Sequence, residues 1–89
     1  MTAWARTEWL DCYVEEGEAV VMLDSGQVVA LSSLAWAILE SLSERPLALE
    51  EVSDRLVARF GAPDGAASPE RLTVKTLETL RDAGLVSRV

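Results

Sequence analysis

The side chains that carry most enzyme chemistry are scarce in this sequence. Cys12 is the single cysteine and histidine is absent, so the chain alone cannot build a histidine-dependent triad, an internal disulfide or a Cys/His zinc site. Ser32 and Ser33 have no candidate base to activate them as nucleophiles. We therefore expect a protein that is not an enzyme, with no catalytic residue, no metal site and no cofactor.

The remaining reactive and charged groups favour structural roles. Cys12 stands among acidic neighbours, which disfavour a reactive thiolate, so we expect a small buried apolar side chain. The acidic cluster Glu15, Glu16 and Glu18 is typical of a solvated turn. Its alternative role is to attract a basic surface of a partner.

Length and charge narrow the class of protein. The 89 residues are enough for one domain, 1–89, and 49% of them are hydrophobic. The net charge of −7 suits a basic protein or a mixed-charge peptide better than a nucleic acid, whose affinity for proteins comes mostly from Lys and Arg. No apolar run reaches the roughly 20 residues of a membrane span, and no signal peptide is visible. We expect a cytoplasmic protein without nucleic-acid or membrane partners.

The first third of the sequence predicts strands. Apolar, β-prone runs occupy residues 9–14, 19–23 and 28–31. The first two runs are separated by an acidic Gly-containing turn, and the last two by residues 24–27, in which Gly26 suits a positive φ angle. The pattern predicts a three-stranded antiparallel meander. Of the tryptophans, Trp9 is expected to pack on this sheet, Trp36 in the core, and Trp4 to lie loose near the terminus.

The rest of the sequence predicts three helices. Ser32 or Ser33 caps the first, over residues 34–42. The second spans residues 49–60, with Ala48 as an uncapped start and Gly61 as its end. A Pro/Gly/Ala loop over residues 62–67 follows, and Ser68-Pro69 opens a third helix that Gly84 ends. The expected fold is α+β and winged-helix-like, a three-stranded antiparallel sheet followed by three helices.

Two surfaces of this fold stand out as binding candidates. On the third helix, Thr73, Leu77 and Leu80 form a core stripe, which leaves an apolar, small-residue outer face. The third strand is apolar throughout and is expected at a sheet edge, where it needs a cover. Either the third helix covers this edge in part, or a partner peptide adds a strand there. A groove between the strand and the helix combines the two interpretations.

The sequence resembles the PqqD-like superfamily of recognition elements for ribosomally synthesised, post-translationally modified peptides. The resemblance rests on the order and spacing of short segments at residues 20–26, 29–32, 35–42, 50–52 and 80–86, and covers roughly Trp9 to Val86. It implies a non-catalytic domain that binds a precursor's leader peptide as an extra strand. The implied partners are that peptide and a modifying enzyme, either a leader peptidase or a radical-SAM enzyme.

Carried over by position, the resemblance implies two walls of a peptide-binding site. The strand wall consists of Gln27, Val28, Val29, Ala30 and Leu31. The helix wall consists of Leu72, Lys75, Thr76 and Thr79. The sequence departs from the commoner family pattern at Ser32-Ser33 and at Ala48, and neither position bears on the groove.

The alternative function is a winged-helix DNA-binding regulator, which would share the helices and the hairpin. Such a protein needs a recognition helix rich in Arg, Lys, Asn or Gln. The second helix offers Arg55 and Arg59, but it also carries Glu50, Glu51 and Asp54.

Overall fold

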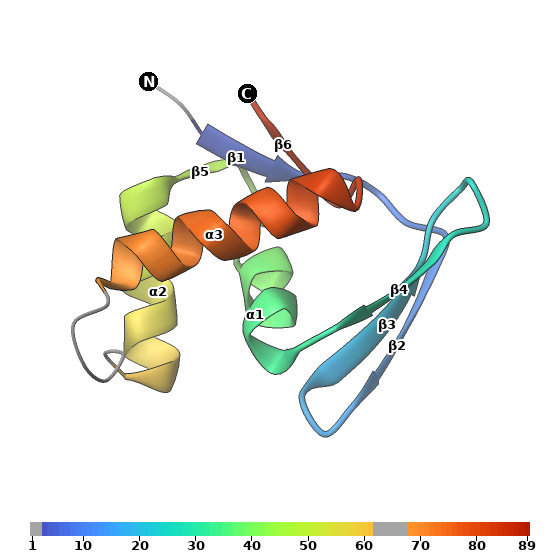
Figure 1. The fold of residues 1–89 in the computed structure, drawn as a ribbon, viewed down its shortest axis with the longest axis horizontal. Coiled ribbons are helices and arrows are strands. Elements are labelled where there is room, and N and C mark those ends of the chain that lie inside the picture. Colours follow the sequence, from blue (N-terminus) through green and yellow to red (C-terminus); the bar gives the residue numbers. More distant parts are fainter. Residues whose placement is uncertain (1–2, 62–67) are drawn as a thin grey trace.

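The computed structural model describes residues 3–61 and 68–89 and has the expected α+β class (Figure 1). The loop predicted over residues 62–67 lies outside the described residues. In chain order the elements are β1 (Ala3–Arg6), β2 (Asp11–Glu15), β3 (Glu18–Met22), β4 (Val28–Leu31), α1 (Ser33–Ser41), β5 (Leu47–Ala48), α2 (Leu49–Phe60), α3 (Pro69–Asp82) and β6 (Val86–Arg88).

Strands β2, β3 and β4 form the predicted antiparallel meander, with β4 at one edge. Gly26 closes the β3–β4 hairpin at a φ of 88°, where a side chain would be strained. The meander is one-sided. Ala19, Val21 and Leu31 are buried against the core, whereas the alternate residues Val20 and Met22 are exposed. Helix α1 packs on the buried side, against β3 and β4.

The predicted helix ends are confirmed. The hydroxyl of Ser32 accepts a hydrogen bond from the Ala35 N–H, and that of Ser68 accepts one from the Arg71 N–H. Ala48 begins α2 without a side-chain cap. At the end of α3, Gly84 has a φ of 83°, and the Leu85 N–H donates to the Leu80 carbonyl, which turns the chain back into the core.

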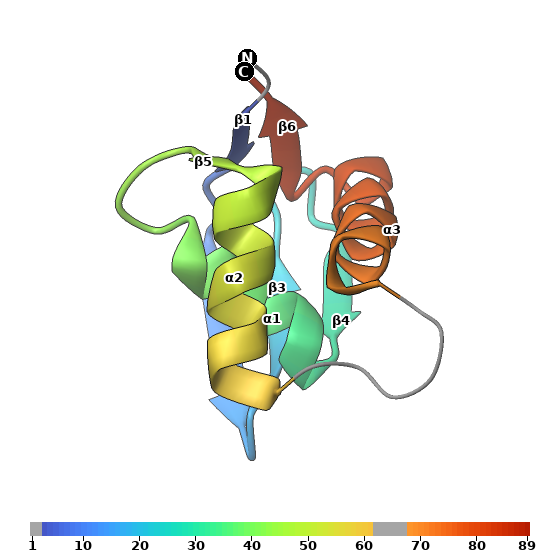
Figure 2. The ribbon, with the colours of Figure 1, turned by 90° about the vertical axis from the view of Figure 1, so that its left-hand side faces the viewer.

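A second sheet, in the order β5-β1-β6, was not predicted. Its strands are too short to show a hydrophobic period, and they pair residues far apart in the sequence. Figure 2 shows β1 and β6 side by side, as their antiparallel pairing requires. Backbone groups of Ala3 and Val89 bond to each other in both directions, and the Thr7 hydroxyl donates to the Gly84 carbonyl at 2.6 Å.

The prediction that Trp4 lies loose is wrong. Its side chain is 3% exposed and belongs to the core cluster, with the Arg88 guanidinium over its ring. Strand β1 holds Trp4 between β5 and β6, so the indole closes one end of the core. A strand of four residues near a chain end gives too little pattern to predict this packing.

The prediction that Cys12 is buried is also wrong, since the thiol is exposed. Cys12 pairs with Val21, which is fully buried, but β2 is the outer strand on the side away from β4. Helix α1 covers β3 and β4. Trp9 packs against Trp36, with 5.7 Å between ring centroids, and both rings are partly buried against the core.

Within the described parts of the chain, no helix is long and apolar enough to cross a membrane.

The burial of Trp4 predicts a large effect on stability. Trp4→Ala should lower the free energy of unfolding by about 3–5 kcal/mol, because it opens a cavity and removes the anchor of the second sheet. Urea unfolding followed by circular dichroism measures this. Leu10→Ala is the control, because Leu10 is exposed, and it should change stability by less than about 0.5 kcal/mol. Equal effects of the two variants would contradict the packing described for Trp4.

Candidate functional site

A groove of about 430 Å³ runs between strand β4 and helix α3. The structure brings most of the predicted site residues together in it: Val29, Ala30 and Leu31 on the strand side, and Leu72, Lys75, Thr76 and Thr79 on the helix side. Ala83 also lines the groove and belongs to the small-residue outer face predicted for the third helix, whereas sequence reasoning missed the other three lining residues, Ser32, Ala35 and Leu80. Leu80 was assigned to the core stripe, and it forms part of the floor because it is buried where the two walls meet.

Gln27 and Val28 do not line the groove. Gln27 precedes β4, and its carbonyl accepts a hydrogen bond from the Leu23 N–H within the hairpin. Val28 begins β4 but faces the side of the sheet opposite the core, where it is exposed. The prediction treated all of residues 27–31 as one wall, whereas on the strand side the groove lining begins at Val29.

The backbone of β4 has one open side. Leu23 and Gln27 form a hydrogen-bonded pair, and such pairs alternate with non-bonded pairs along an antiparallel ladder. The register therefore directs the N–H groups of Val29 and Leu31 toward β3 and those of Val28 and Ala30 away from it. In the described part of the chain β3 is the only strand paired with β4, so the outward amides remain available.

The α3 wall is apolar despite its threonines. The Thr76 hydroxyl donates to the Leu72 carbonyl at 3.0 Å, and the Thr79 hydroxyl to the Lys75 carbonyl at 3.1 Å. Because each hydroxyl donates within the helix, these side chains have no free hydrogen-bond donor to offer the groove. Among the described residues that line the groove, Lys75 alone is charged.

The ion pairs lie elsewhere, beside α2. Arg45 contacts Glu51 at 2.8 Å and Arg59 contacts Glu40 at 3.2 Å. The hydrogen bond from the Arg45 guanidinium holds the pKa of Glu51 below its usual value. The first pair joins the α1–α2 connection to α2 and the second joins α1 to α2, and none of the four residues lines the groove.

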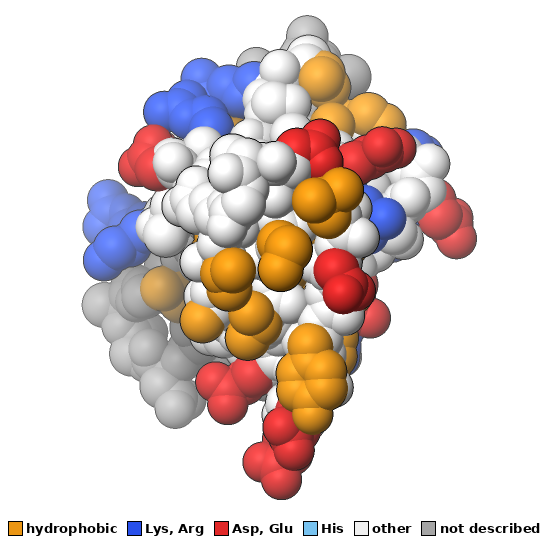
Figure 3. Space-filling view, turned by 90° about the vertical axis from the view of Figure 1, so that its right-hand side faces the viewer, with side chains coloured by type: hydrophobic (Ala, Val, Ile, Leu, Met, Phe, Trp, Pro, Cys, Tyr) orange, Lys and Arg blue, Asp and Glu red, His pale blue; other side chains and the backbone are white. Residues whose placement is uncertain are grey.

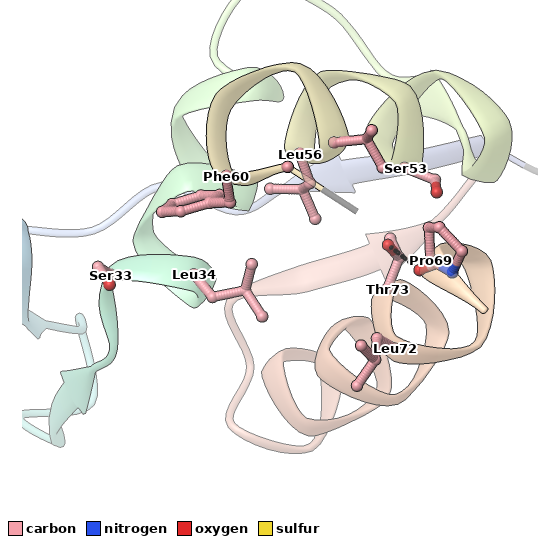
Figure 4. Close-up of a pocket in the computed structure, with 10 residues that line it drawn as sticks. Ser33, Leu34, Ser53, Leu56, Phe60, Pro69, Leu72 and Thr73 are labelled. Carbon is pink, nitrogen blue, oxygen red and sulfur yellow. Dashed lines mark hydrogen bonds between the residues drawn. The ribbon is translucent and has the colours of Figure 1, made fainter. Parts of the chain in front are cut away.

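A second hollow, of about 380 Å³, adjoins the groove across Leu72, which lines both. Figure 4 shows Phe60 and Leu56 from α2 and Leu34 from α1 around the space between the helices, and Leu72 from α3 also lines it. No charged side chain occurs among the described residues that line it. The sequence carried one signal for this hollow, because Phe60 continues the apolar period of α2. In the structure Phe60 is the last residue of the helix, and its side chain is 47% exposed.

The described residues, 3–61 and 68–89, contain no group of three or more Cys, Asp or Glu side chains placed to hold a metal ion.

An apolar edge strand with free amides, facing a helix across a groove, defines a class of small module suited to binding an extended peptide. Within that class, residues 19–86 match the family model described as coenzyme PQQ synthesis protein D (PqqD), and the chain belongs to this family. The match spans both walls of the groove. The family is one of peptide-binding proteins in PQQ biosynthesis, whose members bind a precursor peptide and partner with a modifying enzyme. Neither the curated proteins nor the solved structures gave a match.

The open edge of β4 predicts a specific pattern of amide hydrogen exchange. The Ala30 N–H should exchange much faster than the N–H groups of Val29 and Leu31, because only the latter two are held by β3. Exchange followed by NMR on the free domain measures the three rates directly. Equal protection of Ala30 would mean that another part of the protein covers this edge.

Proposed function

We propose that this domain binds the leader segment of a ribosomally synthesised precursor peptide as a strand added to β4, and presents it to a modifying enzyme or leader peptidase. The domain itself performs no catalysis. The observation that carries this proposal is the groove, in which free amides of β4 face an apolar helix wall. The family's association with a precursor peptide supports the same conclusion.

Strand addition uses each part of this groove. The outward N–H and C=O groups of Val28 and Ala30 supply main-chain hydrogen bonds to the leader, which are independent of its sequence. Side chains of the leader that point toward the core face lie between β4 and α3, against Leu72, Thr76 and Thr79. Contact with these apolar groups supplies selectivity, because they reject charged side chains.

The second hollow extends this selectivity. Strand β4 ends at Leu31, and the next residues, Ser32 and Ser33, line the groove and the hollow respectively. A leader strand that continues past Leu31 therefore passes Leu72 and reaches the hollow. Because none of the described residues that line the hollow is charged and Leu34 and Phe60 border it, the hollow suits a large apolar side chain of the leader.

The competing function, a DNA-binding regulator, gains no support from α2. The Arg59 guanidinium is paired with Glu40, and that of Arg55 lies 3.5 Å from the Ser41 carbonyl. Retention of a DNA fragment together with failure to bind any leader would favour the regulator.

A proline at position 30 tests strand addition. Ala30→Pro removes an outward amide without removing a hydrogen bond to β3, so the domain should stay folded while the leader binds at least about tenfold more weakly. Fluorescence anisotropy of a labelled leader from a precursor encoded beside this gene measures the affinity. Circular dichroism checks the fold.

Val14→Pro is the matched control for this substitution. The same alternation directs the Val14 N–H to the opposite open edge of the sheet, on β2. Its leader affinity should stay within about twofold of the wild type. Strand addition to β4 is refuted if both proline variants bind the leader as the wild type does.

The hollow is tested by a double-mutant cycle. Phe60→Ala in the domain and alanine at a large apolar residue of the leader should each weaken binding, and the two losses should not add. Because Phe60 is half exposed, the domain variant should remain folded. Additive losses, or an unchanged affinity for Phe60→Ala, would leave strand addition standing but remove the hollow from the leader site.

A further inference from the structure

The face of the meander opposite the core is a second surface without a role in the fold. The strand register places Asp11, Tyr13 and Glu15 of β2, Glu18, Val20 and Met22 of β3, and Val28 and Ala30 of β4 on this side. We refer to these residues as the outer sheet face. The core uses the other side, through Ala19, Val21 and Leu31.

The centre of the outer sheet face is apolar. Tyr13, Val20, Met22 and Val28 are between 40% and 63% exposed, although the solvent side of an antiparallel sheet ordinarily carries polar residues. Figure 3 shows hydrophobic side chains gathered on this side of the molecule, with acidic side chains around them. A contiguous apolar patch with a polar border is typical of an interaction surface.

All the charges on this face have one sign. Asp11, Glu15 and Glu18 are acidic, Glu16 lies in the adjoining turn, and no Lys or Arg is among the described residues of the face. The Tyr13 hydroxyl donates to a Glu15 carboxylate oxygen at 3.3 Å, which holds the ring beside the acidic border. A second copy docked face to face would bring carboxylates together, so the charge pattern fits a different partner, whose apolar patch is bordered by Lys and Arg.

We propose that the outer sheet face docks the modifying enzyme through such a basic-bordered apolar patch. This inference rests on the proposed leader binding and adds the surface that the enzyme contacts. A leader strand added beside β4 extends the same sheet, so its alternate side chains join the outer sheet face next to Val28 and Ala30. The enzyme then contacts domain and leader on one continuous surface, which distinguishes the loaded domain from the empty one.

Val20→Lys tests this surface. The substitution places a positive charge at the centre of the face, at an exposed side chain that is neither in the core nor among the residues that line the groove. With the domain saturated by leader, its affinity for the purified enzyme that modifies that precursor, measured by surface plasmon resonance, should fall at least about tenfold. Leader affinity should remain within about twofold of the wild type. Val89→Lys, at an exposed position away from the face, should change neither affinity.

The outcomes separate the two proposals. If loaded wild-type domain and Val20→Lys bind the enzyme equally well, or neither binds it, docking on this face is overturned while leader binding stands. If the wild type forms a dimer in sedimentation velocity that Val20→Lys dissociates, the face belongs to a second copy, and the inference is also overturned. Absence of leader binding by the wild type would instead refute the proposed function.

Discussion

The structure depends on one constraint, that β4 must be buried on one side and open along one edge. Val29 and Leu31 contribute to the core through their side chains, while β3 satisfies only half of the strand's backbone groups. Helix α3 faces the free edge but cannot satisfy it, because the amides of a helix bond within the helix. Groove and edge therefore exist together, and for this reason we propose an extended peptide as the partner that supplies the missing ladder of hydrogen bonds.

The second sheet sets the position of α3. The chain leaves α3 through Gly84 and enters β6, which pairs with β1, and the Thr7 hydroxyl bonds to the Gly84 carbonyl at this point. Trp4 buries the same strand in the core. The far wall of the groove is thus anchored by residues close to the two chain ends, although none of them lines the groove. A change in β1 would alter the groove through the position of α3.

The two proposed surfaces of the meander differ in chemistry. The groove has an apolar lining with Lys75 as its charged group, and we propose that it receives a strand through backbone hydrogen bonds. The outer sheet face is apolar at its centre and acidic at its border, and we propose that it receives a folded surface through contact area and charge. Since an added strand belongs to the sheet, the two surfaces share the leader. None of the described residues that line the groove is acidic, whereas negative charge is concentrated beside β2.

Local sequence was enough to predict the meander and the core stripe of Thr73, Leu77 and Leu80, because each follows from a short-range pattern of apolar residues. It also predicted the helix caps at Ser32 and Ser68, because each cap bonds to a backbone N–H only three residues away. It also placed most of the groove residues on the correct elements. Only the tertiary structure decided the burial of Trp4, the exposure of Cys12 and the second sheet, because these depend on which strand lies next to which. The same holds for Val28 and for the hollow at Phe60. An alternating strand shows which residues share a face, but only the packed neighbours decide which face is covered.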